Sequence, residues 1–189
     1  ADEWVRVNAG QDGAWWMAVN HVLLKEFHHE KQTPYFIDYT KKYTDAPYLV
    51  ELQEIEGGYR PGQLLRANRL ANYKNTESGD WKFLMWDTSE GRPKMPMGSS
   101  GFRWGKEKGK WNLELKDGVD GTAIDPTLSF LTENDGVVQA RFDDFAEGST
   151  LLRGVPVRKV RTVDGKTVVV TTAYDLLMAQ YGVDRGLPG

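Results

Sequence analysis

The sequence of 189 residues contains no cysteine and only three histidines. Without cysteine, these residues can form no disulfide framework, cysteine nucleophile, Cys₄ zinc site or cysteine-ligated iron–sulfur cluster. The histidines are His21, His28 and His29, so a three-histidine metal site would need all of them, although two are adjacent. The composition therefore argues against thiol or metal chemistry carried by this chain's own side chains.

A strong charge of one sign and a long apolar run are also missing. Lys and Arg number 24 against 27 Asp and Glu, a formal net charge of −3, so we expect no nucleic-acid partner. No run of 18 apolar residues occurs, and we expect no direct membrane span. The length fits one domain or one large piece of a longer protein. Because the first residue is not Met, we expect a piece.

Two helices are predicted in the first quarter of the chain. Apolar residues recur with a 3.6-residue period over residues 14–27 and cover nearly all sides, which predicts a helix buried on most of its surface. Asp12 is suited to cap its N-terminus. Thr33 and Pro34 predict the start of a second helix, because Pro favours the first helical position. Residues 4–7 are predicted as a short strand that precedes both helices.

The remaining elements are mostly strands. We expect them at residues 48–55, 81–87, 110–116, 155–163 and 166–172. Asp164 and Gly165 predict a type I′ hairpin turn between the last two. The stretch 91–101 holds too much Gly, Pro and Ser for a regular element. A final helix is expected from Ala173, with Gly182 as its left-handed stop. The predicted class is α/β to α+β, with helices at both ends and a β-rich, loop-rich middle.

An ordered set of short motifs covers nearly the whole chain. They are Gly-Gln-Asp-Gly-Ala at 10–14, His-Val-Leu-Leu-Lys-Glu-Phe-His at 21–28, Tyr-Phe-Ile-Asp-Tyr at 35–39, Tyr-Thr-Asp at 43–45, Gly-Phe-Arg-Trp-Gly at 101–105, Lys-Gly-Lys-Trp-Asn-Leu-Glu at 108–114, Thr-Thr-Ala-Tyr-Asp-Leu at 171–176, Tyr-Gly at 181–182 and Arg-Gly-Leu at 185–187. This set resembles the dimethyl-sulfoxide-reductase family of molybdenum enzymes. The pair at 101–105 and 108–114 resembles in particular its nitrate reductase branch, the catalytic alpha subunits of membrane-bound respiratory nitrate reductases.

The resemblance implies a large parent protein. Family subunits are several times longer and bind two molybdopterin guanine dinucleotides around one molybdenum, plus one 4Fe-4S cluster. Here we expect an internal segment that contributes part of the cofactor shell and binds neither the metal nor the cluster. Residues 1–73 would end a nucleotide-binding α/β domain, 74–150 would form a loop-rich β insertion, and 151–189 a β-hairpin with a C-terminal helix.

The resemblance also implies an activity and partners. The parent would reduce nitrate to nitrite with quinol-derived electrons. It would bind an iron–sulfur beta subunit and associate with the membrane through partner subunits, on a side that this segment does not reveal. Family relatives that reduce chlorate or selenate, or oxidise nitrite, are alternatives. We expect the segment alone to be inactive and to carry no catalytic residue.

Gly10, Gln11 and Asp12 form the candidate cofactor-binding site. From the residues alone, Asp12 is more simply a helix cap. The resemblance implies instead that this turn holds a guanine of the cofactor, because the family uses a matching Gly-x-Asp turn for that purpose. A carboxylate can accept two parallel hydrogen bonds from the N1–H and N2–H groups of guanine. Gly10 would let the backbone approach closely. Gln11 stands where the family more commonly has Thr.

Other candidate residues have simpler structural interpretations. His21 is expected to be a satisfied structural histidine, and His28 and His29 to act as cations at a helix C-terminus. Arg103, in the loop of residues 95–104, could bind a phosphate or carboxylate or could stack on a tryptophan.

Two residue groups leave binding functions open. The tryptophans are expected mainly in the core, with a stacking surface as the alternative. Asp143, Asp144 and Glu147 fit a solvated acidic loop better than a cation site. A stand-alone, non-catalytic interaction module remains the second hypothesis for the whole chain. It predicts a well-behaved monomer, whereas a segment of a larger protein should expose apolar patches.

Overall fold

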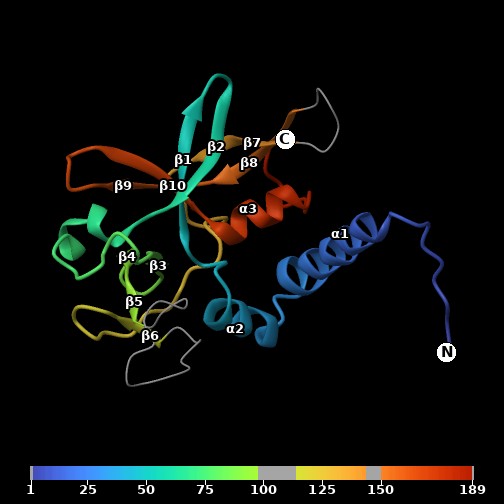
Figure 1. Ribbon diagram of the computed structural model, residues 1–189, viewed down its shortest axis with the longest axis horizontal. Helices are drawn as coiled ribbons and strands as arrows, with labels where there is room; N and C mark the ends of the chain where they lie inside the picture. Colours follow the sequence, from blue (N-terminus) through green and yellow to red (C-terminus); the bar gives the residue numbers. More distant parts are fainter. Residues whose placement is uncertain (1, 98–113, 144–149, 189) are drawn as a thin grey trace.

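The computed structural model describes residues 2–97, 114–143 and 150–188 (Figure 1). The helical elements are α1 (Asp12–Val22), the π-helix η1 (Leu23–Glu30), α2 (Pro34–Tyr43), the 3₁₀ turns η2 (Ala67–Arg69) and η3 (Ala71–Tyr73), and α3 (Ala173–Gln180). The strands are β1 (Leu49–Ile55), β2 (Gly58–Leu64), β3 (Met85–Asp87), β4 (Arg92–Lys94), β5 (Pro96–Met97), β6 (Glu114–Asp117), β7 (Val137–Asp143), β8 (Thr150–Pro156), β9 (Arg158–Arg161) and β10 (Thr167–Thr172). This mixed content, with helices at both ends, confirms the predicted fold class.

A six-stranded sheet in the order β8-β7-β2-β1-β10-β9 organises the molecule. Neighbouring strands are antiparallel except β2 and β7, which pair in parallel. The sheet takes strands from each of the three sequence segments proposed above. Successive residues of a strand face opposite sides, so Leu49 joins one apolar cluster while Val50 joins another. Leu176 and Ala179 of α3 cover the Val50 side, and η2, η3 and Trp86 cover the other.

Two small sheets flank the main one and correct one prediction. Residues 91–101 were expected to be irregular, yet in their described part, 91–97, β4 pairs with β3 and β5 pairs with β6; residues 98–101 lie outside the described ranges. Gly91 has φ of +63° and closes the β3–β4 turn. Pro93 pairs with Trp86. Proline has no N–H to donate, but β4 is an edge strand with one neighbour in its sheet, so the nitrogen of Pro93 can lie on the unpaired side without loss of a hydrogen bond.

The C-terminal hairpin is confirmed, but the predicted type I′ turn is wrong, because Asp164 lacks the positive φ that this turn requires, and one strand is shorter than predicted. β9 and β10 pair around Gly165, whose φ is +80°. The predicted strand over 155–163 is wrong at its start, because Val155 and Pro156 belong to β8 and pair with β7. α3 begins at Ala173 as predicted, and Gly182 ends it with φ of +67°.

The N-terminal part differs most from prediction. Residues 4–7 form no strand, since they have no strand partner among the described residues. α1 has no buried residue, so the expected burial of this helix is wrong here. Trp15, Trp16 and Val22 are 38%, 58% and 45% exposed, and α1 extends to one side of the sheet (Figure 1). Within the described ranges, no helix has the length and apolarity to cross a membrane.

Candidate functional site

The turn of Gly10, Gln11 and Asp12 lies at the free end of α1. The Gln11 N–H donates to the Asn8 carbonyl at 3.1 Å, which closes the turn. Gly10 has φ of +82°, and an added Cβ would meet nothing within 4 Å. Glycine is therefore needed for the backbone conformation rather than for space. The turn leaves open space into which a ligand could approach the backbone.

Asp12 was predicted as the N-cap of this helix, but it is the first helical residue of α1. Gln11 occupies the N-cap position and makes no side-chain capping bond. The Asp12 carboxylate is exposed and forms no hydrogen bond or ion pair with a described residue. Of the two roles considered for Asp12, the helix cap is therefore not the one that its carboxylate has. The carboxylate is available to accept hydrogen bonds from a ligand, while the first-turn N–H groups contribute a positive partial charge.

We call α1 and η1 together, residues 12–30, the N-terminal arm. The arm is held to α3 at the end of α1 that lies away from the Gly10–Asp12 turn. His21 Nδ1 lies 2.7 Å from the carbonyl oxygen of Tyr181, and Asn20 donates to the Tyr181 hydroxyl at 3.3 Å. Tyr181 follows the last turn of α3, where carbonyl groups lack helical partners. Leu24 packs with Met178 in an apolar cluster beside these contacts. His21 thus has the structural role that the sequence predicted.

His28 corrects the prediction of a cationic histidine pair. Its ring is 9% exposed and lies between Phe36 and Tyr174, with ring centroids at 5.6 and 5.8 Å. Nδ1 is buried without a partner. Burial lowers the pKa of His28, because the charged ring would lose hydration. His28 is therefore an apolar packing element, and the neutral ring is the favoured form.

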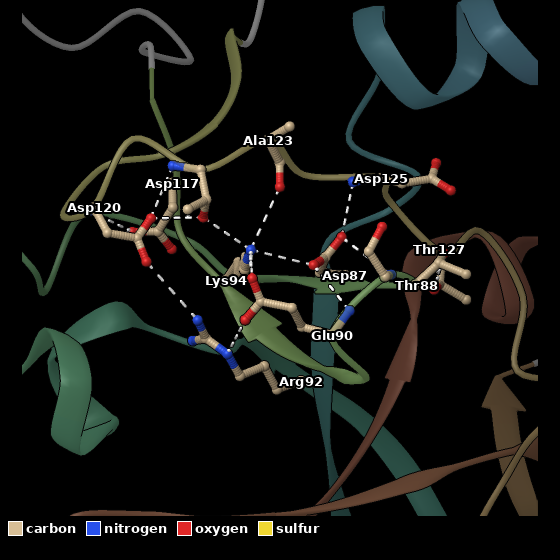
Figure 2. A network of polar contacts seen from close by, with 12 residues as sticks. Asp87, Thr88, Glu90, Arg92, Lys94, Asp117, Asp120, Ala123, Asp125 and Thr127 are labelled. Carbon is tan, nitrogen blue, oxygen red and sulfur yellow. Dashed lines mark hydrogen bonds and ion pairs between the residues drawn. The ribbon is translucent and has the colours of Figure 1, made fainter.

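A buried ion cluster, not predicted from the sequence, joins the β3–β4 hairpin to residues 117–125 (Figure 2). The Lys94 ammonium, fully buried, lies 3.2 Å from Asp87 and also contacts Glu90 and the Thr122 hydroxyl. Burial alone would raise the pKa of Asp87, but the Asp125 N–H and Lys94 hold it below its usual value. The carboxylates around Lys94 are occupied by protein partners, so the cluster is structural.

A second buried pair joins two of the recognised motifs. Asp175, at 0% exposure, accepts from Ser129, from the Phe130 N–H and from Arg185 Nη1 at 2.5 Å. Burial raises the pKa of Asp175, although Arg185 opposes that rise. This pair fixes the segment after α3 to the loop that precedes β7. Sequence spacing carries no signal for the contact, because Ser129 is distant in the chain.

The remaining candidate residues divide into two groups. Among the described tryptophans, Trp86 is in the core as predicted, whereas Trp15, Trp16 and Trp81 are exposed, contrary to prediction. Arg103, Asp144 and Glu147 lie outside the described residues, as do the side chain of Asp143 and the motifs at 101–105 and 108–113. No cluster of three His, Asp or Glu side chains able to hold a metal ion occurs in the described ranges.

The chain is similar to known proteins over almost all of its length. It is 41% identical to the respiratory nitrate reductase 1 alpha chain of Escherichia coli K12, covering 98% of this chain and 16% of that protein. It is 38% identical to the nitrate reductase alpha chain of Bacillus subtilis 168, over 99% of this chain and 15% of the relative. The nitrate reductase alpha subunit of Mycobacterium tuberculosis H37Rv is 39% identical, over 100% and 15%. No profile of a known protein family matches. The chain thus spans about a sixth of the length of these relatives.

Proposed function

We infer that this chain is a segment of a nitrate reductase alpha chain, because proteins of that name match it at 38–41% identity over 98% of its length or more. That similarity is the single observation that carries the assignment. On this basis we propose that the whole protein reduces nitrate to nitrite with electrons derived from quinol. Chlorate, selenate and nitrite chemistry remain alternatives for the parent, because substrate choice would depend on residues around the metal.

Within the parent, this segment would contribute to the shell of a molybdopterin guanine dinucleotide. Residues 1–73 would include the end of a nucleotide-binding domain, with Gly10, Gln11 and Asp12 at its ligand edge. When bound, the cofactor supplies the molybdenum at which oxygen-atom transfer occurs. The chain has no cysteine to ligate a 4Fe-4S cluster, and we propose that the ligand to molybdenum lies in another part of the parent. The remaining segments, 74–150 and 151–189, would support this edge and pack against other domains.

The residues of the turn fit a guanine. The Asp12 carboxylate is exposed and unpaired among the described residues, so it can accept two hydrogen bonds from the guanine N1–H and N2–H. The positive φ of Gly10 places backbone at the surface without a side chain. Gln11 would border the base. The role of these residues is to bind and orient a nucleotide, and none of them would take part in the chemical step.

The exposed arm favours a segment over a freestanding module. α1 is apolar on most sides but buries no residue, and free-standing domains rarely leave such surface in water. We propose that the rest of the alpha chain covers α1, that an iron–sulfur beta subunit binds the parent, and that membrane association arises through partner subunits. Light scattering of the purified 189-residue chain should show self-association. A stable monomer at all concentrations would favour the freestanding module.

The nucleotide assignment is tested with Asp12→Asn in a full-length alpha chain that contains this segment. Hydrogen bonds to a charged group contribute about 1.5–3 kcal/mol each, so losing them should lower guanine dinucleotide retention by roughly tenfold or more. The nucleotide released from the purified protein can be quantified by chromatography. Asp38→Asn is the matched control, because Asp38 is exposed and, among the described residues, pairs with Lys42 alone. Unchanged retention in Asp12→Asn would contradict the assignment.

The isolated chain provides a second test. We expect no nitrate reduction with a reduced dye as electron donor, because the chain lacks residues for the metal and for electron entry. Measurable turnover by the 189-residue chain would contradict the proposed division of roles.

A further inference from the structure

Arg153 on β8 is a partly buried charged side chain that has no hydrogen-bond or ion-pair partner among the described residues. Its Nε atom is buried and makes no hydrogen bond, and none of the described residues forms an ion pair with its guanidinium. By contrast, Arg185 nearby is fully paired with Asp175. A buried N–H donor without an acceptor is costly, even where the rest of the side chain is only partly buried. The unpaired state of Arg153 therefore calls for an acceptor that these residues do not supply.

A small cavity lies beside this guanidinium. Its volume is about 90 Å³, and its wall includes Arg153, Gly154, Gly182, Asp184, Arg185 and Leu187. A water occupies about 30 Å³ in the liquid, so the volume corresponds to about three waters and suits a small polar group. A ligand for this cavity must therefore be small and must accept hydrogen bonds from the Arg153 guanidinium.

Backbone packing keeps the cavity narrow. Gly154 donates to the Pro188 carbonyl at 2.6 Å, and a Cβ on Gly154 would lie 2.5 Å from that oxygen. On the other side, a Cβ on Gly182 would lie 3.6 Å from Arg153 Nη2. The guanidinium therefore lies against the backbone that follows α3. The nearby carbonyls of Met178 and Ala179 accept from the Val183 and Gly182 N–H groups, so they are already engaged.

Among the described residues that line the cavity, Asp184 is the one with a carboxylate, and it does not neutralise Arg153. Its Oδ1 accepts from the Gly186 N–H at 2.9 Å, which turns the carboxylate toward its own backbone. The two side chains form no ion pair within 4 Å, whereas Arg185 satisfies that criterion with Asp175. No described carboxylate therefore forms an ion pair with Arg153 across this cavity. The negative charge of Asp184 would repel a bound anion, but it does not itself pair with Arg153.

We propose that this cavity binds a small planar oxyanion, of the nitrate or carboxylate class, through the fork of N–H groups on Arg153. A guanidinium offers two parallel donors whose spacing matches the two oxygens of a planar oxyanion. The source is either a free anion or the carboxylate side chain of another protein segment. The site is separate from the Gly10–Asp12 turn, and the proposal does not depend on the proposed nucleotide role.

The test is an NMR titration of the ¹⁵N-labelled 189-residue chain with sodium nitrate, sodium acetate and sodium chloride at constant ionic strength. We expect saturable shifts of the Arg153 Nε–H and of the Gly154 and Gly182 amides with nitrate and acetate, and weaker ones with chloride. Arg153→Gln should weaken binding at least tenfold. Asp184→Asn should strengthen it about threefold or more, because it removes the opposing charge. Arg141→Gln, an exposed arginine on β7, changes net charge equally and should leave binding unchanged.

Further variants and a longer protein keep the result decisive. Arg153→Lys retains the charge without the fork and should bind with intermediate affinity, so a folding defect in Arg153→Gln alone cannot mimic the result. A full-length alpha chain that still binds added nitrate at Arg153 identifies a free anion as the source. If only the 189-residue chain binds, the occupant is a carboxylate from another segment. Non-saturable shifts, equal shifts with chloride, or shifts that persist in Arg153→Gln would overturn the proposal.

Discussion

His21 Nδ1 lies 2.7 Å from the backbone carbonyl of Tyr181, so a side chain from the N-terminal arm satisfies the end of the C-terminal helix α3. A carbonyl accepts but cannot donate, which means that Nδ1 carries the hydrogen. The contact joins elements from opposite ends of the chain. It also determines where the arm, and the Gly10–Asp12 turn at its far end, lie relative to the sheet.

His21→Ala should loosen the arm while the sheet stays folded. The variant removes one hydrogen bond to a helix terminus, worth about 1 kcal/mol. Amide hydrogen exchange in α1 and η1 should accelerate several-fold, whereas exchange in β1 and β10 should not change. Lys25→Ala is the control, because the Lys25 side chain is half-exposed and its ion pair within the described residues is a long one, 4.0 Å to Glu30. Equal exchange rates in the two variants would show that the contact does not hold the arm.

His28 should make packing of the arm sensitive to acid. Burial lowers the pKa of His28 in the folded protein, so the unfolded chain binds a proton more readily. This contribution to stability is present above the unfolded pKa of about 6.5 and is lost as pH falls below it. His28→Gln should reduce the drop in melting temperature between pH 7.5 and pH 5.5. His29→Gln is the control, and an identical drop in all three proteins would refute the prediction.

Lys94 should be among the most sensitive positions in the molecule. Lys94→Met leaves Asp87, at 0% exposure, without its cation, and breaking a buried pair in this way costs about 3–5 kcal/mol. Urea denaturation should report this loss. The double variant with Asp87→Asn should recover part of it, because no buried charge then remains unpaired. If the Lys94→Met variant unfolds at the same urea concentration as the wild type, the contacts of Lys94 with Asp87 and Glu90 do not stabilise the protein in solution.

Two glycines should respond in opposite directions to alanine. Gly154→Ala places a Cβ 2.5 Å from the Pro188 carbonyl, and such overpacking typically costs about 1–3 kcal/mol. Gly13→Ala meets nothing within 4 Å and should raise α1 helicity, since Ala is favoured over Gly by about 1 kcal/mol in a helix. Thermal unfolding measures the first change and far-UV circular dichroism the second. A stable Gly154→Ala protein would show that the 187–188 segment can move away.

Local signals in the sequence predicted local structure well. Pro34 starts α2, Gly165 turns the last hairpin and Gly182 ends α3, because each residue restricts or permits one backbone conformation. The same logic placed Gly10–Asp12 at a helix start. The predicted N-cap was one residue too late: Gln11 occupies the cap position and Asp12 is the first helical residue.

Contacts between distant residues could not be predicted in the same way. Lys94 lies in a stretch whose Gly and Pro content indicated a loop, and its partners come from other elements. Likewise, the apolar pattern of α1 indicates that it will be covered but not by what. Strand order follows from such contacts as well. The resemblance of the motifs indicated that distant segments belong to one protein family, but it did not predict which of their residues are in contact.

The pairing of β1 with β10 inside the sheet has a consequence for biosynthesis. These neighbours lie far apart in sequence, and contacts of that kind form slowly because a long loop must close first. On a ribosome, β1 would emerge with one edge unpaired, and this edge stays open until β10 is synthesised, although β2 and β7 are made earlier. Nascent chains of this protein should therefore depend on chaperones during that interval, and translational pausing before β10 should increase their aggregation.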